Sequence, residues 1–367
     1  MDPCDEFVFL YLLKVMSANF NIKRWKFFCD IRSDPKNIRI MRFTIGVTLA
    51  VTISSAINWP LAFLVPILSA VFLTLPIPNP GLRVGLTNML YTLSAFALGS
   101  VFTLFLLPFP LVYVPMLGLI LFNLYYMLNR GASFWLVLMS ILALLILPML
   151  GNNSEGLAFG FASGFIFSGW ATVIIVWLAY FIVPDQPGTP ALPKSPGLQR
   201  GYSRPAAKAA LKSTAAVLPI VVLMLSFNMT NMLLVMVFTA MFIMSPEINK
   251  GKAAGVKTMK SALIGGMFAF VFYSLIIVVP EYHFFIVLML VTTLVIASNS
   301  FSDKPNAMYY ASCFSTFYIL VNSSQAEGAD FSSVFITRLL LILLATVYVV
   351  FSLIVFEHFW PSRETDS

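Results

Sequence analysis

Residues 42–110 constrain this chain most, because their turn residues recur at one fixed distance along the sequence. Lys212 lies 170 positions after Arg42. The same offset pairs residues that break or turn helices: Asn58 with Asn228, Pro76 with Pro246, Asn79 with Asn249, Gly81 with Gly251, and Gly85 with Gly255. Shared hydrophobicity matches Leu to Val readily, but it does not align Asn, Pro and Gly together. The register therefore predicts two copies of one unit.

Composition places both copies in a membrane. Hydrophobic residues make up 59% of the 367 residues and charged residues 10%, against about 45–50% and about 25% in soluble domains. A helix that crosses the hydrocarbon core needs roughly 20 apolar residues, so the chain has room for about a dozen. We predict an all-α polytopic membrane protein with about 12 transmembrane helices, arranged as two parallel six-helix repeats.

Changes in composition divide the chain into five parts. Six prolines, with several Gly, Ser and basic residues, lie between Pro184 and Pro205, a composition typical of an extended linker. The first two spans, which end at Ile57 and Ile77, are at the short limit for a crossing, so they tilt little or cross incompletely. The predicted parts are an N-terminal cytoplasmic or interfacial segment (1–41), a first repeat (42–183), a Pro-rich cytoplasmic linker (184–206), a second repeat (207–357) and a cytoplasmic tail (358–367).

Basic residues indicate the orientation in the membrane. When the predicted spans alternate, all of the 22 Lys and Arg residues except Arg338 fall in loops on one side, whereas Glu155 and Glu281 fall on the other. The positive-inside rule then places both termini and the linker in the cytoplasm. An even number of spans per repeat makes the repeats parallel. The net charge of +7 thus belongs to loops beside anionic headgroups, and we expect no nucleic-acid partner.

The residue patterns of an enzyme or a metal site are missing from the sequence. HExxH, GxSxG and P-loop motifs do not occur. Cys4, Cys29 and Cys313 lie far apart with no CxxC pair, and His283 and His358 are predicted on opposite faces of the bilayer. We therefore expect no catalytic residue, no metal ligand, no cofactor and no nucleotide-driven pump.

Arg338 is the clearest candidate for a functional side chain, because an ionisable residue at membrane depth is costly and often functional. It lies about one and a half turns into the last predicted span. A guanidinium that faces a water-filled cavity can bind a carboxylate through two hydrogen bonds. Two structural alternatives stay open: Arg338 reaches the outer headgroups, or it pairs with Glu327 or Asp330.

Two further groups of residues are candidates because they occupy matched positions of the repeats. Arg42 and Lys212 lie at the cytoplasmic ends of equivalent spans, where they form a positive vestibule or simply anchor the helices at the headgroups. Short, interrupted segments at equivalent positions of two halves point to a transport site. The predicted wall of the substrate path therefore contains Asn58, Trp59, Asn228, Thr230 and Asn231. The alternative for the Asn residues is purely structural, because Asn is favoured in turns whether or not a ligand binds there.

The same features carry a family resemblance. The turn Asn58-Trp59-Pro60, the cytoplasmic loop Pro80-Gly81-Leu82-Arg83 and the duplicated six-span unit resemble the fusaric acid resistance and aromatic acid exporter superfamily, in its compact (DUF2955-like) form without large cytoplasmic domains. Plant aluminium-activated malate transporters look like distant relatives of one unit. Many members carry a Gly-Thr pair in the third span, where this chain has Ser94-Ala95 and Ile264-Gly265, so no residue role is carried over.

This resemblance implies export of aromatic or other hydrophobic organic acids across a bacterial inner (plasma) membrane. Compact members are often encoded beside a periplasmic membrane-fusion (adaptor) protein, so the expected partners are the organic acid, membrane lipid and such an adaptor, and a homo-oligomer is compatible with the sequence. The proton motive force is the expected energy source, although no acidic residue lies deep in a predicted span. A passive organic-anion channel and a non-transporting scaffold for an adaptor complex are the alternatives.

Overall fold

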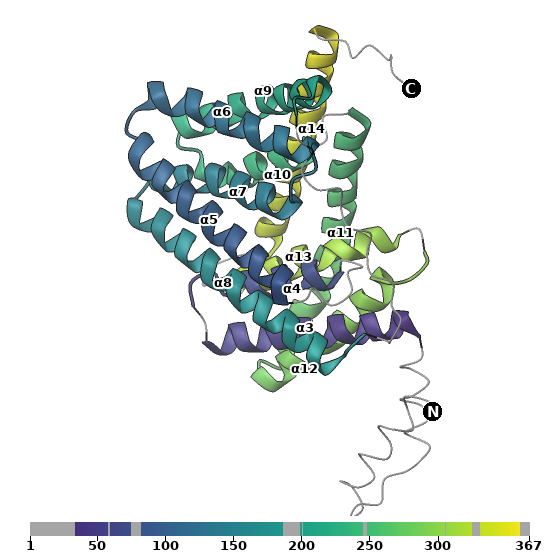
Figure 1. The fold of residues 1–367 in the computed structure, drawn as a ribbon. Coiled ribbons are helices and arrows are strands. Elements are labelled where there is room, and N and C mark those ends of the chain that lie inside the picture. The colour runs from purple at the N-terminus through teal and green to yellow at the C-terminus, as the bar shows by residue number, and fades with distance from the viewer. Residues whose placement is uncertain are drawn as a thin grey trace, which may run out of the picture.

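The chain is all-helical over the residues that the computed structural model describes, which are 34–57, 59–74, 82–185, 199, 201–244, 248–304, 306–324 and 331–359 (Figure 1). The first six helices are α3 (Pro35–Ile57), α4 (Leu64–Thr74), α5 (Leu82–Leu106), α6 (Pro110–Asn129), α7 (Phe134–Gly151) and α8 (Glu155–Ile182). The second six are α9 (Arg204–Ser226), α10 (Leu233–Phe242), α11 (Ile248–Val278), α12 (Tyr282–Ser300), α13 (Ala307–Ser324) and α14 (Phe331–Phe359), with a 3-10 turn, η1 (Thr230–Met232), before α10.

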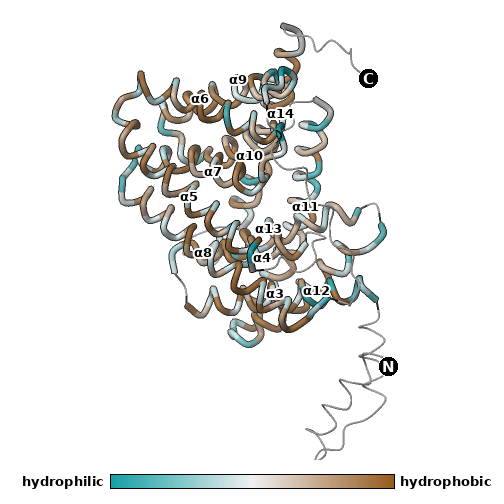
Figure 2. Tube along the Cα trace, in the orientation of Figure 1, coloured by the Kyte–Doolittle hydropathy of each residue, from teal (hydrophilic) through white to brown (hydrophobic). Residues whose placement is uncertain are grey.

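Nine of the described helices are long and apolar enough to cross a membrane, so the chain is a multi-pass membrane protein. Figure 2 shows these helices hydrophobic along most of their length. Large apolar side chains point outward from them, and Leu98, Leu111 and Phe181 are 69%, 92% and 83% exposed. In water such a surface would cause association, whereas hydrocarbon solvates it. The predicted N-terminal segment lies outside the described residues up to residue 33.

Three of the twelve described helices, α4, α10 and α13, do not meet the criteria for a span. The helices α4 and α10 have 11 and 10 residues, which at 1.5 Å per residue cover roughly half of the hydrocarbon core. Both are shorter than the predicted spans because a turn precedes each of them. In the first unit Leu61 has a positive φ of 65°, and the Leu64 nitrogen donates to the Leu61 carbonyl.

The third of these helices, α13, is less hydrophobic than its neighbours because it carries Ser, Thr, Tyr and Asn side chains. Other helices cover it: α13 packs against α4, α11, α12 and α14. Cys313, Phe314 and Phe317 are completely buried. A helix that is enclosed by protein need not match the hydrophobicity of lipid, which explains how α13 tolerates its polar residues.

Packing joins the two halves of the chain at several places. Within the first half, α3 packs on α4 and α8, and α5 packs on α7 and α8; within the second half, α9 packs on α10 and α14, and α11 packs on α13 and α14. Between the halves, α6 packs on α9 while α12 packs on α3, and α7 packs on α10 while α13 packs on α4. These four contacts form two pairs in which the roles of the halves are exchanged, whereas α7 also packs on α9 without such a counterpart among the larger contacts.

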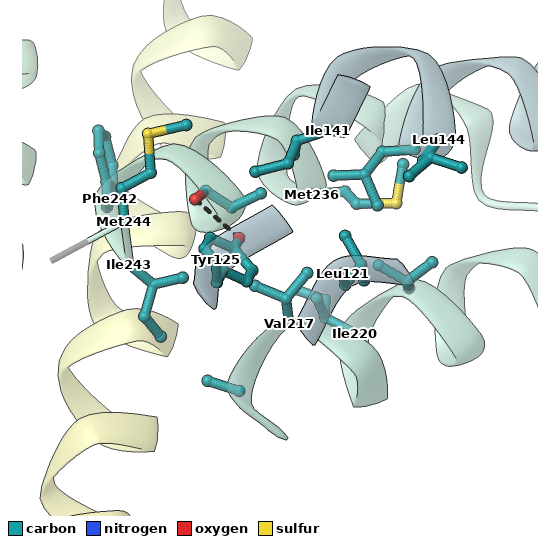
Figure 3. Close-up of a cluster of buried hydrophobic side chains, with 14 of the residues drawn as sticks. Leu121, Tyr125, Ile141, Leu144, Val217, Ile220, Met236, Phe242, Ile243 and Met244 are labelled. Atoms are coloured by element: carbon teal, nitrogen blue, oxygen red, sulfur yellow. Dashed lines mark hydrogen bonds between the residues drawn. The ribbon is translucent and has the colours of Figure 1, made fainter. Parts of the chain in front are cut away.

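Two large hydrophobic clusters follow the same plan. One combines α6 and α7 with α9, α10 and α14, and the other combines α12, α13 and α11 with α3, α4 and α8. Figure 3 shows the first cluster around Tyr125, which is completely buried and whose hydroxyl donates to the Ala240 carbonyl at 3.0 Å. Both large clusters therefore draw side chains from both halves, whereas two smaller clusters lie within the first half alone.

Candidate functional site

Two cavities lie on either side of the C-terminal end of α13. The first, the arginine cavity, has a volume of 350 Å³ and is lined by Asn231, Ile319, Ser323, Ser333, Thr337 and Arg338, among others. The second, the tyrosine cavity, has a volume of 320 Å³ and is lined by Ser54, Ser55, Trp59, Phe285, Tyr318 and Asn322, among others. Consecutive residues of α13 face different cavities: Tyr318 and Ile319 form one such pair, and Asn322 and Ser323 form another. This helix end is therefore their common wall.

The arginine cavity contains a partly buried cation, one of whose nitrogen atoms is buried and unpaired. The Nε atom of Arg338 is buried and has no hydrogen-bond partner among the described residues. Asn231, Ser323 and Thr337 supply polar groups around the same space. Glu327 and Asp330, the two acids considered as partners for Arg338, lie outside the described residues. Burying a charged group is costly unless it is paired, so this cavity favours the entry of an anion.

Helix ends add to the positive potential of this cavity. Leu234 lines it from the first turn of α10, and Ser333 and Val334 line it from the first turn of α14. The N-terminus of a helix carries a partial positive charge and exposed N–H donors. The partial positive charge of these two ends, together with the guanidinium, favours a negatively charged group in the cavity. Leu234, Ile319 and Val334 leave apolar surface beside it.

In the first half, the turn after α3 is fastened to α8. Ser168 lies 170 positions before Arg338, and Leu61 lies 170 positions before Asn231. Ser168 is completely buried. Its hydroxyl accepts a hydrogen bond from Trp59 Nε1 at 3.1 Å and donates to the Leu61 carbonyl at 3.0 Å. A small hydroxyl thus fastens the turn 59–63 to α8, whereas the long cation in the second half lines an open cavity.

The tyrosine cavity lies between the two halves and differs in chemistry. Trp59 reaches it from the turn after α3, Phe285 from α12 and Tyr318 from α13. Trp59 also makes an edge-to-face contact with Phe167, with ring centroids 5.1 Å apart. None of its described lining residues is Asp, Glu, Lys, Arg or His.

The structure divides the predicted substrate-path residues between several places. Arg338 and Asn231 line the arginine cavity, and Trp59 lines the tyrosine cavity on the other side of α13. Asn228 has a positive φ of 50°, and its side-chain nitrogen donates to Asn153 Oδ1 at 3.0 Å. Thr230 begins η1, and its backbone nitrogen donates to the Asn228 carbonyl. The remaining candidate, Asn58, lies outside the described residues.

The two predicted vestibule residues are not brought together. Arg42 is buried; its Nε donates to the Val183 carbonyl at 2.9 Å, and Nη2 donates to Asp185 Oδ1 at 2.5 Å. The guanidinium also lies 3.9 Å from the ring centroid of Tyr180. Lys212 is half-buried on α9, and α9 and α3 lie at opposite ends of the molecule (Figure 1). Arg42 therefore ties α3 to the end of α8.

Sequence reasoning missed Ser168 and Tyr318. Nothing in its own sequence context distinguishes Ser168 from other Ser residues in apolar spans, but the offset of 170 positions from Arg338 would have selected it. Tyr318 lies in α13, an 18-residue helix that is not apolar enough to count as a span, so the polar composition of α13 was the available signal. The described residues contain no group of three or more His, Cys, Asp or Glu side chains that could hold a metal ion.

Comparison with known proteins gives one partial match. Residues 39–179 match a family described as "Protein of unknown function (DUF2955)". The matched part covers fewer than half of the 367 residues, and it includes Trp59 and Ser168 but not the arginine cavity. No curated protein and no solved structure matches the chain. The match carries no link to the fusaric acid resistance superfamily, which stays a resemblance of motifs and architecture.

Proposed function

We propose that the protein is a bacterial inner-membrane efflux transporter for aromatic or other hydrophobic organic acids. The observation that carries this proposal is Arg338, whose buried Nε has no partner among the described residues and whose side chain lines an open cavity of 350 Å³. A carboxylate bound there would neutralise the guanidinium and satisfy its donors. The apolar side chains of Leu234 and Ile319 would contact the hydrophobic body of the acid.

Two parallel six-helix repeats form the proposed framework of this transporter. The offset of 170 positions and the paired contacts between the halves support it, because α3 to α8 and α9 to α14 exchange roles in both hydrophobic clusters. The site would then sit at the turn between the first two helices of the second repeat. Interrupted helices at repeat interfaces are where many transporters bind substrate.

Loop contacts support the proposed orientation, with both termini in the cytoplasm. The Gln199 nitrogen donates to the Arg130 carbonyl, and Lys36 forms an ion pair with Asp303; both contacts join segments predicted on the cytoplasmic side. Asn228 with Asn153, and Ser55 with Tyr282, join segments predicted on the opposite side. The arginine cavity would accordingly open toward the periplasm, where the proposed adaptor protein would receive the substrate. The adaptor itself is proposed from the resemblance alone.

A passive organic-anion channel is the second candidate, and the placement of the acids favours it. The acidic side chains that the structure describes lie at helix ends or between helices: Asp34, Glu155, Asp185, Glu281 and Asp303. Proton-coupled transporters commonly carry the proton on a carboxylate within the membrane. An efflux transporter that uses the proton motive force would be expected to have such a carboxylate, whereas a passive channel would not need one.

Reconstitution into liposomes tests these alternatives. Benzoate uptake that rises with an imposed pH gradient and that Arg338→Met abolishes is the expected result for the transporter. Large anion currents in planar bilayers, independent of a proton gradient, would replace it with the channel. Protein that moves no organic acid under any gradient would instead favour a non-transporting scaffold.

A further inference from the structure

The tyrosine cavity has no role in the binding of an anion at Arg338, because α13 separates the two cavities. Its inner part is formed by buried residues, which include Ser54, Ala62 and Tyr318. Its mouth is formed by Ser55 and Asn322, whose side chains are exposed. The cavity is therefore a deep pocket with polar groups at both ends rather than a shallow depression.

Aromatic side chains surround the middle of this cavity. Trp59 and Phe63 belong to the turn between α3 and α4, Phe285 to α12 and Tyr318 to α13. Aromatic rings attract further rings through edge-to-face and offset contacts, in addition to the burial of apolar area. Neighbouring contacts already hold two of these rings in place: Trp59 lies edge-on to Phe167, and Tyr318 is stacked on Phe314 at 5.9 Å.

The polar groups of the cavity are neutral hydrogen-bonding groups. The Ser54 hydroxyl donates to the Val51 carbonyl at 3.1 Å, and Ser54 also lies within hydrogen-bonding reach of Tyr318. Asn322 makes no side-chain hydrogen bond within the described part of the chain, so its amide can both donate and accept. Because no described charged residue lines the cavity, a carboxylate that entered would lose its hydration without gaining a counter-charge.

From this geometry we propose that the tyrosine cavity is a second binding site, one that takes an uncharged single-ring aromatic molecule with a hydroxyl substituent, such as a phenol. The ring lies among Trp59, Phe63 and Phe285, and the hydroxyl reaches the buried pair Ser54 and Tyr318. The site is distinct from the anion site at Arg338. The class of ligand follows from the lining of the cavity, which has several aromatic rings and no described charged side chain. This inference does not depend on whether the protein transports organic acids.

Fluorine NMR with 4-fluorophenol tests this site on the full-length protein in lipid nanodiscs. The expected result is a saturable change in the fluorine signal that empty nanodiscs do not give. Ala62→Phe fills the cavity from its wall and is expected to weaken binding at least about tenfold. Ala97→Phe is the matched control, because Ala97 is exposed on α5 and does not line this cavity, so the same substitution there leaves binding unchanged.

A second variant keeps the test decisive if Ala62→Phe does not fold. Tyr318→Phe preserves the ring and removes only the hydroxyl, and it is expected to weaken 4-fluorophenol binding about threefold to tenfold while leaving binding of fluorobenzene unchanged. Three results would overturn the proposal: no saturable signal, which would leave a cavity filled with water only; equal binding in folded Ala62→Phe; or displacement of 4-fluorophenol by 4-fluorobenzoate at equal concentration.

Discussion

The indole nitrogen of Trp59 donates a hydrogen bond to Ser168 Oγ at 3.1 Å, and the Ser168 hydroxyl in turn donates a hydrogen bond to the Leu61 carbonyl. One buried oxygen therefore satisfies a side-chain donor and a backbone acceptor in the turn after α3. In the second half, the residue at the same offset is Arg338, and the corresponding turn borders a cavity. A small buried hydroxyl thus fastens the first of these turns, whereas a cation lines the cavity beside the second.

Removing the Ser168 hydroxyl should loosen the first turn. Ser168→Ala leaves the Trp59 nitrogen without its partner and removes one of the two hydrogen bonds to the Leu61 carbonyl, which costs about 1–3 kcal/mol of folding free energy. Thermal unfolding in detergent measures the loss, and a cycle with Trp59→Phe should show that the two effects do not add. Ser163→Ala is the control, since the Ser163 hydroxyl is exposed and bonds only to the backbone of its own helix. Equal losses at both positions would disprove the fastening role.

Replacing Arg338 should stabilise the protein while removing anion binding. Arg338→Met takes away a buried cation whose Nε is unsatisfied within the described chain and leaves an apolar side chain of similar length. We expect folding to become more favourable by about 1 kcal/mol or more. A lower unfolding temperature than that of the wild type would instead mean that Arg338 has a structural partner.

Breaking the buried ion pair of Arg42 should destabilise the packing of α3 on α8. The side chains of Arg42 and Asp185 are 5% and 23% exposed. Because Asp185 is partly solvated, we expect Asp185→Asn to cost about 1–3 kcal/mol, below the range for a fully buried pair. Lys36→Ala is the control, because the Lys36–Asp303 ion pair is exposed, at 50% and 84% of its side-chain surfaces, and should give no measurable change. Similar unfolding temperatures for both variants would contradict this.

Close packing of α11 on α13 should make Gly265 intolerant of a side chain. A Cβ at Gly265 would lie 2.6 Å from the Cys313 carbonyl oxygen, a backbone atom that cannot turn away. Gly265→Ala is expected to cost about 1–3 kcal/mol through forced separation of the helices. Gly160→Ala on α8 meets no atom within 4 Å and should be neutral or stabilising by up to about 1 kcal/mol. If both variants unfold alike, the two helices are less tightly packed than described.

The sequence predicted the helical membrane architecture because hydrophobic runs and Pro-Gly turns are local features. It did not predict that α4 and α10 would be so short, since the turns before them are set by contacts such as that between Leu61 and Ser168, which are far apart in the chain. Hydropathy also understates α13, because other helices pack against it and bury several of its polar residues, such as Thr316 and Tyr318.

The candidate site was predictable only in part. Arg338 stood out as an isolated charge in an apolar span, and Asn231 stood out as part of an interrupted hairpin. Their meeting in one cavity depends on the packing of α10, α13 and α14, which no local pattern encodes. Arg42 was predicted to line a vestibule, but it forms a buried ion pair with Asp185 instead. Asp185 lies 143 positions away in the sequence, so no local pattern indicates this pairing.

Calorimetric titration of the purified protein with benzoate tests the anion site at Arg338 most directly. We predict saturable binding to the wild type, loss of at least about tenfold in affinity for Arg338→Met, equivalent to about 1.4 kcal/mol, and a smaller loss for Arg338→Lys, which keeps the charge but not the paired donors. Lys252→Met, which removes an exposed charge on α11, should bind as the wild type does. Benzoate binding that is equal in the wild type and Arg338→Met would contradict the account.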